Sequence, residues 1–503
     1  MKRLLSILLA ALCAACTTTP PAETAAHPEW SYNAVVYEMN VRQYTPEGTC
    51  AAAARELPRL KRMGADIIWL MPIHPIGVKE RKGTLGSYYA ISDYCAVNPE
   101  FGTLDEFDRF VAEAHRLGLR VILDWVANHT SPDARWITER PADWYVRDSL
   151  GRTIVQYDWT DIAKLNYDNA DMRQEMERAM RFWLERGIDG FRCDMACEVP
   201  IDFWRTTLPA LRRDYPQIFL LAEGEDPALH EGAFDASYSW ELHHLMNDIA
   251  RGKRGVAELK EYLKKDAANT PHEAFRLMFT SNHDENSWAG SEFERMGDAA
   301  RVMALLTFTL PKGMPLIYTG QEIGYDHRFA FFEKDPVPQW CENEFGEFYA
   351  ALARLRHEHP ALASGERGAE ARYPAEGSLP DGVFGFTRGT GSDAVTVIAN
   401  LTAAEQEVGL PTEGPLREFF TGQILSTGSR AVLPAWGWLV LTPEKEGSGR
   451  KPAAERTHEP TFILTLPNKQ YLEPNFDDTC SSRHALLCST TGIRPRLDSR
   501  RIG

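Results

Sequence analysis

Short apolar runs alternate with amphipathic segments along most of the chain, starting near residue 34. Each apolar run spans only a few residues and ends in polar or charged residues, which is typical of buried strands. The runs that predict strands are residues 34–41, 65–72, 120–128, 188–196, 217–225, 275–286 and 314–324, with residues 232–240 as a weaker candidate.

Helical patterns lie between most of these runs, at residues 51–64, 104–118, 171–187 and 293–310. Strands that alternate with helices predict a parallel sheet covered by helices. Eight such units predict an α/β fold of the closed (β/α)8 TIM-barrel type, whose functional residues lie at the carboxyl ends of the strands. A doubly wound open sheet is the competing architecture, but no glycine-rich phosphate loop follows the first predicted strand.

The same pattern divides the chain into domains. We expect the barrel in residues 31–361, with a short loop subdomain at about 129–170, where a long segment rich in aromatic and turn residues follows the third strand. Residues 362–443 carry short runs that predict a C-terminal antiparallel β-sandwich. Residues 444–503 lose this periodicity and are interpreted as a poorly ordered tail with one short apolar run, TFILTL.

The first residues have the pattern of a targeting segment. Lys2 and Arg3 precede the run LLSILLAALCAAC, which ends in small residues. This run is shorter than the about 20 residues that a transmembrane helix needs. The end of this run resembles a bacterial lipoprotein signal, so residues 1–16 are interpreted as a signal peptide with lipid attached to Cys16. We therefore expect an exported bacterial lipoprotein of the outer membrane or periplasm, with a lipid anchor to the membrane and residues 17–30 as a tether. Simple cleavage and secretion is the alternative.

Charge and cysteine spacing exclude several classes of protein. The net charge of -16 and the pI near 5.4 argue against a nucleic-acid partner, which requires clustered positive charge. Export makes disulfides feasible, but among the cysteines after residue 16 no C-x-x-C occurs, and the paired short spacings of a zinc site are absent. A redox or metal protein built on Cys193 and Cys197 therefore lacks both the spacing and an electropositive thiol site, and we assign no metal-binding residue.

Carboxylates stand at the ends of several predicted strands. The four acids are Asp124, Asp194, Glu223 and Asp284, and the same strand ends carry Arg192, His129 and His283. One acid at a strand end has a simple structural explanation, but buried charge is costly unless it is paired. Several acids at the carboxyl ends of barrel strands predict a catalytic site instead.

Glycosidic bond cleavage is the chemistry that needs several carboxylates without a metal motif or an activated Ser or Cys. One carboxylic acid protonates the leaving oxygen, and an ionised carboxylate attacks the anomeric carbon or activates water. Arg192 and Asp194 share one face of a strand, so the guanidinium favours the ionised form of Asp194. Glu223 follows the apolar run IFLLA, whose low dielectric favours the neutral, proton-donating form.

These segments resemble the α-amylase superfamily of retaining glycoside hydrolases, glycoside hydrolase family 13. The matching motifs occur in the family's order over about residues 31 to 443. They are GSYYAISDYCAVNPEFGT (86–103), DWVANH (124–129), AKLNYDN (163–169), GFRCDMA (190–196), LLAEGE (220–225), FTSNHD (279–284) and GMPLIYTGQEIG (313–324).

The resemblance implies a role for each residue at these positions. It makes Asp194 the nucleophile of a covalent glycosyl-enzyme, Glu223 the acid and then the base, and Asp284 a ligand of sugar hydroxyls that stabilises the transition state. His129 and His283 would hydrogen-bond the same sugar, and Arg192 would orient Asp194. Tyr89 would stack on the sugar ring, and Asp124 would be mainly structural beside Arg192.

Two positions depart from the family pattern. Many α-amylases carry Lys-His shortly after the nucleophile, on the leaving-group side, whereas Cys197 and Glu198 stand there in this chain. The motif that closes the loop subdomain often ends in Asp, a calcium ligand, and Asn166 takes that place. Asn128 occupies a position that can bind calcium, but no full oxygen cage can be named. We expect no required cofactor, with calcium as the open alternative.

The predicted function is therefore a retaining α-glucan hydrolase of the α-amylase type. It would cleave α-1,4-glucosidic bonds in starch or maltodextrins, with an α-glucan or maltooligosaccharide as substrate. α-Glucosidase, cyclomaltodextrinase and glucanotransferase activities remain alternatives on the same site, because loop shape decides among them. A hypothesis from another class is an inactive sugar-binding protein, which would be expected to lack Asp194, Glu223 or Asp284, yet all three are present.

Overall fold

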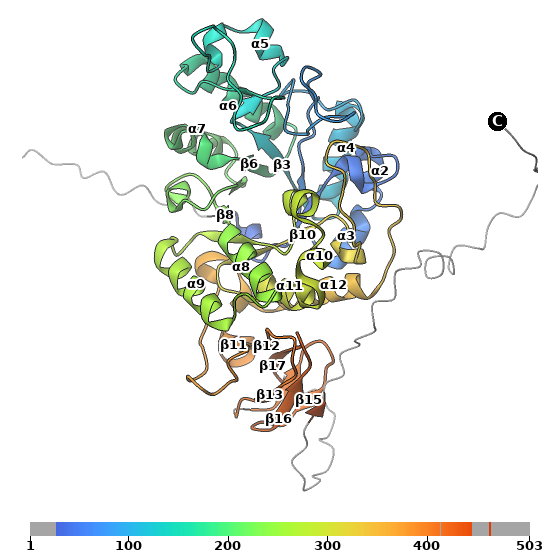
Figure 1. The fold of residues 1–503 in the computed structure, drawn as a ribbon, viewed down its shortest axis with the longest axis vertical. Helices are drawn as coiled ribbons and strands as arrows, with labels where there is room; N and C mark the ends of the chain where they lie inside the picture. Colours follow the sequence, from blue (N-terminus) through green and yellow to red (C-terminus); the bar gives the residue numbers. More distant parts are fainter. Residues whose placement is uncertain (1–26, 413, 445–461, 464–503) are drawn as a thin grey trace, which may run out of the picture.

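The computed structural model describes residues 27–412, 414–444 and 462–463. At its centre, eight parallel strands close into a barrel with the helices around it (Figure 1). In order around the barrel the strands are β1 (Val36–Met39), β10 (Gly313–Tyr318), β9 (Phe275–Met278), β8 (Ala236–Tyr238), β7 (Phe219–Ala222), β6 (Gly190–Asp194), β3 (Arg120–Val126) and β2 (Ile67–Leu70). The predicted TIM barrel is confirmed, and the weak strand candidate at 232–240 contains β8.

Alternate residues of the barrel strands form an apolar interior and, at the carboxyl ends of the strands, a polar layer. Val36, Ile122 and Leu316 belong to an apolar cluster contributed mainly by the barrel strands, and they are at most 2% exposed. Two residues further along the same strands, on the same face, stand the polar side chains of Glu38, Asp124 and Tyr318. The interior therefore changes from an apolar core to a polar layer toward the carboxyl ends of the strands.

Helices cover the outside of the barrel. They are α1 (Val41–Tyr44), α2 (Cys50–Ala54), α3 (Leu57–Met63), α4 (Leu104–Arg116), α6 (Ala170–Leu184), α7 (Ile201–Asp214), α8 (Trp240–Ala250), α9 (Val256–Asn269), α10 (Glu292–Met296), α11 (Ala300–Thr309) and α12 (Glu344–Glu358). Two predicted helices are each split in the structure. Pro58 in the first turn of α3 starts a new helix after α2, and Gly297, with φ of 53°, separates α10 from the residues that lead into α11.

The segment after β3 forms the loop subdomain at the top of Figure 1. It begins with β4 (His129–Thr130), which pairs in antiparallel fashion with β5 (Ala163–Lys164), and it carries the short helix α5 (Arg135–Glu139) between them. His129 is opposite Lys164 in this pairing. The two-stranded base thus fixes the subdomain directly beside a residue predicted for the site.

Two small sheets follow the barrel, at the opposite end of the long axis from α5 (Figure 1). The first contains β11 (Val383–Arg388), β12 (Val395–Asn400), β17 (Trp438–Pro443), β14 (Leu416–Glu418) and β15 (Ile424–Leu425), and the second contains β13 (Gln406–Gly409), β16 (Arg430–Leu433) and β18 (Phe462–Ile463). β18 falls within the tail predicted to lack order, at the TFILTL run, and pairs with β16 in parallel. The first sheet packs on the barrel through Phe348 of α12, whose ring lies 5.6 Å from Trp438.

The N-terminal prediction is only partly covered by the described residues. The signal peptide with Cys16 and residues 17–26 of the predicted tether lie outside them. The last tether residues are packed against the barrel: the ring of His27 contacts Asp235 Oδ1 at 2.6 Å and the carbonyl oxygen of Glu273 at 3.0 Å. Among the described residues, no helix is long and apolar enough to cross a membrane.

Candidate active site

Arg192 lies at the centre of the polar layer and joins three of the predicted carboxylates. Its side chain is fully buried; Nη1 donates to Asp124 Oδ1 at 2.9 Å and to Asp194 Oδ1 at 3.1 Å, and Nη2 lies 3.0 Å from Glu223 Oε2. The structure therefore brings together acids from β3, β6 and the end of β7. One guanidinium that bridges Asp194 and Glu223 places both carboxylates within reach of one glycosidic bond.

The backbone after Asp194 also aims a donor at Glu223. Met195 has φ of 47°, in the left-handed region, and its N–H donates to Glu223 Oε2 at 2.8 Å. Glu223 Oε2 is thus held between the guanidinium of Arg192 and this backbone N–H. The apolar surroundings that the sequence suggested for Glu223 belong to the strand before it, while the carboxyl group itself lies in the polar layer and is partly exposed.

Asp284, His283 and Tyr89 meet on the other side of the site. His283 Nε2 is 3.3 Å from Asp284 Oδ2 and 2.7 Å from the Tyr89 hydroxyl, which donates to Asp124 Oδ2 at 3.0 Å. The ring of Tyr89 stacks on His283 at 5.4 Å. Segments far apart in the sequence thus converge on one hydrogen-bonded group.

Glu38 is a site residue that the sequence analysis missed. It lies on β1, and its Oε1 is 2.5 Å from His283 Nδ1, with both side chains buried. The available signal was that Glu38 is the one charged residue in the predicted strand AVVYEMNV. On its own this signal names no partner, because the histidine comes from a strand end almost 250 residues away in the chain.

His129 is the first residue of β4, at the start of the loop subdomain, and its role in sugar binding stays a prediction. Burial lowers its pKa to about 4, so the ring is neutral near pH 7. The Nδ2 group of Asn128 lies 3.1 Å from His129 Nδ1. If that nitrogen accepts the hydrogen bond, the single ring proton is on Nε2, which makes Nε2 a donor.

Gln156 links the Asn128–His129 pair to the segment after the predicted nucleophile. The sequence analysis did not identify Gln156 either. Its Nε2 donates to Glu198 Oε2 at 2.8 Å, and its Oε1 accepts from Asn128 Nδ2 at 2.7 Å. Because a carboxylate only accepts, Glu198 fixes which end of the Gln156 amide faces Asn128. The departure at Glu198 therefore has a structural role as the end of a polar chain that spans the subdomain and the barrel.

The charges of the site leave it with more acids than cations. Burial, and then the charge of Glu223, raises the pKa of Asp194 well above its usual range, and burial is also the first cause of raised pKa values at Asp124 and Asp284. Burial lowers the pKa of His283, but the charges of Asp284 and Glu38 outweigh it and raise that pKa to about 9. Among these groups, the ring of His283 therefore keeps its second proton near neutral pH.

The residues suggested for calcium do not form a cation site. Asn128 turns its nitrogen toward Gln156, and Asn166 uses its Nδ2 to bond the carbonyl oxygen of Asp143 at 2.9 Å and its Oδ1 to accept from the N–H of Asp168 at 3.1 Å. Within the described ranges, no three His, Cys, Asp or Glu side chains are grouped closely enough to hold a metal. The amide groups of Asn128 and Asn166 are thus engaged with other protein groups, and the calcium requirement stays open.

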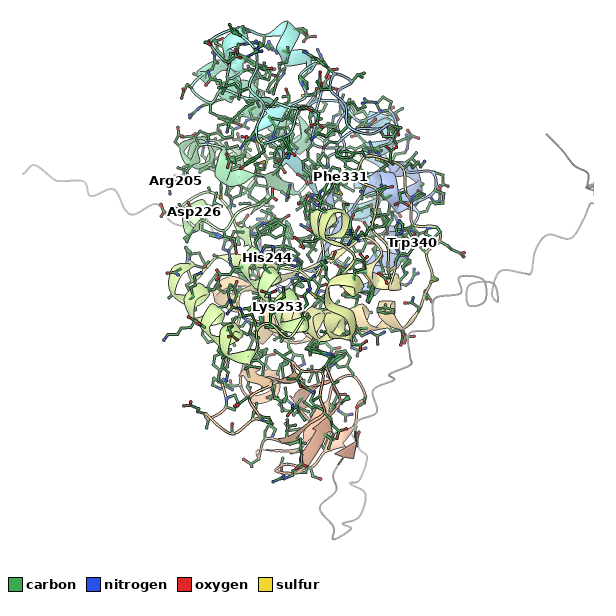
Figure 2. All side chains as sticks on the ribbon, viewed as in Figure 1. Arg205, Asp226, His244, Lys253, Phe331 and Trp340 are labelled. Carbon is green, nitrogen blue, oxygen red and sulfur yellow. The ribbon has the colours of Figure 1, made fainter. Side chains whose placement is uncertain are left out.

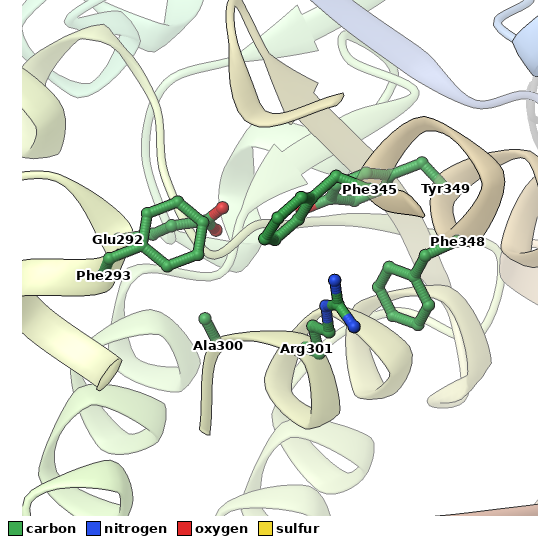
Figure 3. A pocket seen from close by; sticks show the side chains of 7 residues that line it. All are labelled: Glu292, Phe293, Ala300, Arg301, Phe345, Phe348 and Tyr349. Atoms are coloured by element: carbon green, nitrogen blue, oxygen red, sulfur yellow. The ribbon is translucent and has the colours of Figure 1, made fainter. Parts of the chain in front are cut away.

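Aromatic rings continue outward from the site. Phe331, labelled in Figure 2, stacks with Tyr89 at 6.3 Å and lies 5.3 Å from Trp288, which is on the turn after Asp284 and is 59% exposed. A separate small recess between α10, α11 and α12 (Figure 3) is lined by Glu292 and Arg301, among others, and contains none of the predicted site residues. The track of rings, and not this recess, leads from the carboxylates to solvent.

Comparisons with known proteins cover the part of the chain that carries these residues. The family model described as "Alpha amylase, catalytic domain" matches residues 34–149 and 142–350. The chain is similar to Alpha-amylase MalA of Haloarcula japonica, at 30% identity over 397 residues that cover 76% of this chain and 58% of that protein. It is also similar to an alpha-1,4-glucan:maltose-1-phosphate maltosyltransferase of Arcanobacterium haemolyticum, at 31% identity over 306 residues that cover 55% of this chain and 42% of that protein.

Among solved structures, the fold is similar to that of an alpha-amylase from Lactobacillus plantarum. The TM-score is 0.74 at 29% identity, over 82% of this chain and 99% of that one. The chain spans less than two thirds of the length of the two curated relatives named above.

Proposed function

This chain belongs to the α-amylase family of glycoside hydrolases, whose members act on O-glycosyl bonds, and we propose that it is a retaining α-glucan hydrolase that cleaves α-1,4-glucosidic bonds. Starch, maltodextrins or maltooligosaccharides are its substrates in this proposal. The observation that carries it is the single buried guanidinium of Arg192, which holds Asp194 and Glu223 together at the carboxyl end of the barrel.

In the first step, Asp194 attacks the anomeric carbon of the bound sugar from the face opposite the leaving oxygen. The bond from that carbon to the leaving oxygen breaks while Glu223 transfers its proton to this oxygen. This step requires the proton on Glu223 and an ionised Asp194, and the contact from Arg192 Nη1 to Asp194 Oδ1 favours that ionised carboxylate.

In the second step, Glu223 removes a proton from water, and the water oxygen attacks the anomeric carbon and releases Asp194 as a carboxylate. The product keeps the α configuration because two inversions occur. Asp284 accepts hydrogen bonds from sugar hydroxyls, while the neutral ring of His129 donates through Nε2. Arg192 stabilises the carboxylate of Asp194 both before attack and after release.

Glucan transfer is the second candidate function. The relative named as a maltosyltransferase supports it, because transfer differs from hydrolysis only in whether a sugar hydroxyl or water attacks the intermediate. α-Glucosidase and cyclomaltodextrinase activities use the same carboxylates on chain ends and on cyclic substrates. An inactive sugar-binding protein is disfavoured by the complete set of Asp194, Glu223 and Asp284.

A product profile on maltoheptaose, pullulan and a cyclodextrin separates these activities. Early mixtures of short oligosaccharides from maltoheptaose support an endo-acting hydrolase, glucose alone supports an α-glucosidase, and products longer than the substrate support transfer. Proton NMR of the first products gives the configuration directly. β-Anomers as first products would rule out the double displacement, and the absence of turnover on every substrate would favour the binding protein.

We also propose that the enzyme works without calcium, since the Asn128–Gln156–Glu198 chain occupies the junction between the subdomain and the barrel. The amide orientation imposed by Glu198 turns the nitrogen of Asn128, rather than its oxygen, toward this junction. No step of the proposed reaction needs a metal.

Export as a lipoprotein anchored through Cys16 is a proposal that rests on the sequence of the first residues. The small residues before Cys16 and the basic start support it. Expression of the full chain in a Gram-negative host, followed by membrane fractionation, tests it. Cys16→Ser should move the enzyme from the membrane fraction to the soluble fraction, and an unchanged distribution would contradict the anchor.

A further inference from the structure

Glu38 is a buried carboxylate that the proposed reaction does not use. It is 0% exposed on β1, and its Oε1 lies 2.5 Å from Nδ1 of His283, which is itself 1% exposed. Its other oxygen, Oε2, is buried and has no hydrogen-bond partner within the part of the chain that the structure describes. Among the described residues, His283 is therefore the one side chain that hydrogen-bonds this carboxylate.

The second nitrogen of the same imidazole also faces acceptors. Nε2 is 2.7 Å from the Tyr89 oxygen and 3.3 Å from Asp284 Oδ2. The single proton of the Tyr89 hydroxyl is directed to Asp124 Oδ2 at 3.0 Å, so the Tyr89 oxygen can only accept from His283. With a carboxylate at Nδ1 and acceptors at Nε2, both ring nitrogens need a proton.

We propose that Glu38 is a positioning residue that keeps His283 in its doubly protonated, positively charged form, so that Nε2 donates to Asp284 and to a hydroxyl of the bound sugar. The part of this inference that concerns the sugar rests on the proposed function. The part that concerns the charge of His283 rests on the Glu38–His283–Tyr89–Asp124 contacts alone.

A positive His283 balances the charge of the site. The groups that face or influence the His283–Glu38 pair are Glu38 on β1, Tyr89 after β2, Asp124 on β3, Arg192 on β6, Tyr238 on β8, Asp284 beside His283, and Tyr318 on β10. Arg192 already serves Asp124, Asp194 and Glu223, which leaves Asp284 without a cation of its own. The imidazolium 3.3 Å away supplies that cation and favours the carboxylate form of Asp284.

Nitrogen-15 NMR of histidine side chains tests the charge directly in the unaltered, full-length enzyme. Comparison with His283→Asn assigns the signal, and both nitrogens should carry protonated shifts at pH 7 and titrate only above pH 8. A neutral ring at pH 7 would overturn the proposal. This readout does not depend on turnover, so it remains valid even if the proposed substrate is wrong.

Glu38→Gln tests the consequence, because it keeps the shape of the side chain and removes its charge. The titration of His283 and the alkaline limb of the kcat/KM profile should both move down by about one pH unit or more. Glu38→Asp, which restores the charge, should return both toward their original positions. A merely structural role for Glu38 would lower activity equally at every pH.

Glu292→Gln is the matched control. Glu292 is also a buried carboxylate, 5% exposed, but it accepts hydrogen bonds from Thr280 Oγ1 and Gln321 Nε2, away from His283. Its substitution should leave the His283 titration and the pH profile unchanged. If Glu38→Gln folds, as judged by its melting curve, and shows the same titration as Glu292→Gln, the inference fails.

Discussion

At the scale of single residues, the site has more acidic side chains than cationic ones. Arg192 contacts Asp124, Asp194 and Glu223, and it is 0% exposed, so removing one acid changes the pKa of the others. Burial lowers the pKa of Arg192, but the charges of Asp124 and Glu223 outweigh burial and raise that pKa well above its usual range. Arg192 therefore stays cationic throughout the accessible pH range.

Asp194→Asn should abolish turnover without unfolding the protein. The amide cannot attack the anomeric carbon, and loss of a covalent nucleophile typically costs a factor of about 10⁴ or more in kcat. Stability should change little or rise, because burial and Glu223 raise the pKa of Asp194 and make its charge costly. Initial rates on maltoheptaose and a thermal melt measure the two effects; retained turnover would remove Asp194 as nucleophile.

Asp189→Asn is a matched control from just before the same strand. Asp189 binds the His115 ring at 2.7 Å, Arg120 Nη1 at 2.9 Å and the N–H of Val121 at 2.8 Å, at the amino end of the barrel. The same chemical change there should lower the melting temperature while the folded fraction keeps its kcat. A large loss of kcat at Asp189 would mean that the Asp194 result is not specific.

The site residues that the sequence analysis found differ from those that it missed in how local their signal in the sequence is. Asp124, Asp194 and Asp284 stand at strand ends, where barrel geometry makes any acid a candidate. Glu38 and Gln156 act through partners far away in the chain, at His283 and at Asn128 and Glu198. Strand alternation predicts the face on which Glu38 lies, but contacts between distant segments require the folded structure.

At the scale of structural elements, the loop subdomain is joined to the barrel by a hydrogen-bonded chain of side chains. Gln156→Leu breaks this chain at its centre and leaves Asn128 and Glu198 without their partner. Two partly exposed hydrogen bonds are worth about 1 kcal/mol each, or about 2 kcal/mol together, so we expect kcat/KM to fall by a factor of up to about 30. We expect kcat/KM to fall because Asn128 no longer holds His129 in place. Initial rates on maltoheptaose measure this change.

The controls for this prediction separate the chain from a metal site. Gln423→Leu, the same change at an exposed position in the C-terminal sheets, should leave the rates unchanged. The unaltered enzyme should keep its melting temperature and activity after exhaustive treatment with EDTA. Inactivation by EDTA with recovery on adding calcium would contradict the metal-free junction.

The turn after Asp284 presents an exposed indole at the end of a track of rings. Trp288 is 59% exposed and contacts Phe331 at 5.3 Å and Phe332 at 5.8 Å. Trp288→Ala should raise KM for maltoheptaose about threefold to tenfold, since stacking on an aromatic ring is worth about 0.5–1.5 kcal/mol. The rate on a short aryl glucoside that does not reach the indole should stay the same.

Tyr373→Ala is the control for loss of an exposed aromatic side chain. Tyr373 is 46% exposed and lies against Phe384 of the C-terminal sheets, so its removal should not change KM for either substrate. Equal losses on the long and short substrates would show that Trp288 supports the fold of the turn rather than a sugar.

At the scale of the whole molecule, the barrel was predictable because short, mainly apolar strands alternate with helices along the chain. β2 (IIWL) is wholly apolar, and the central residues of β3 are apolar up to Asp124, a pattern typical of strands in a parallel sheet covered by helices. The helices were less predictable, since the breaks near Pro58 and Gly297 interrupt segments whose periodicity continues across them. The β16–β18 pairing joins chain segments about 30 residues apart, which periodicity does not detect.

The start of the described chain is held on the barrel by the side chain of His27. His27 contacts Asp235 at 2.6 Å and the carbonyl oxygen of Glu273, and these residues precede β8 and β9, at the end of the barrel opposite the acids. Burial lowers the pKa of His27, but its hydrogen bond to Asp235 and the charge of Asp235 outweigh it, so the folded pKa lies above 6.5.

A raised folded pKa gives stability that is fully present below the unfolded value of about 6.5 and is lost as pH rises through the folded value. His27→Ala should therefore lower the melting temperature by about 1–3 °C at pH 5.5, with a smaller difference at pH 9. His272→Ala, at an exposed ring 3.7 Å from an exposed Glu370, should show no difference at either pH. Equal effects of His27→Ala at both pH values would mean that packing of the ring, and not its charge, holds the N-terminal segment against the underside of the barrel.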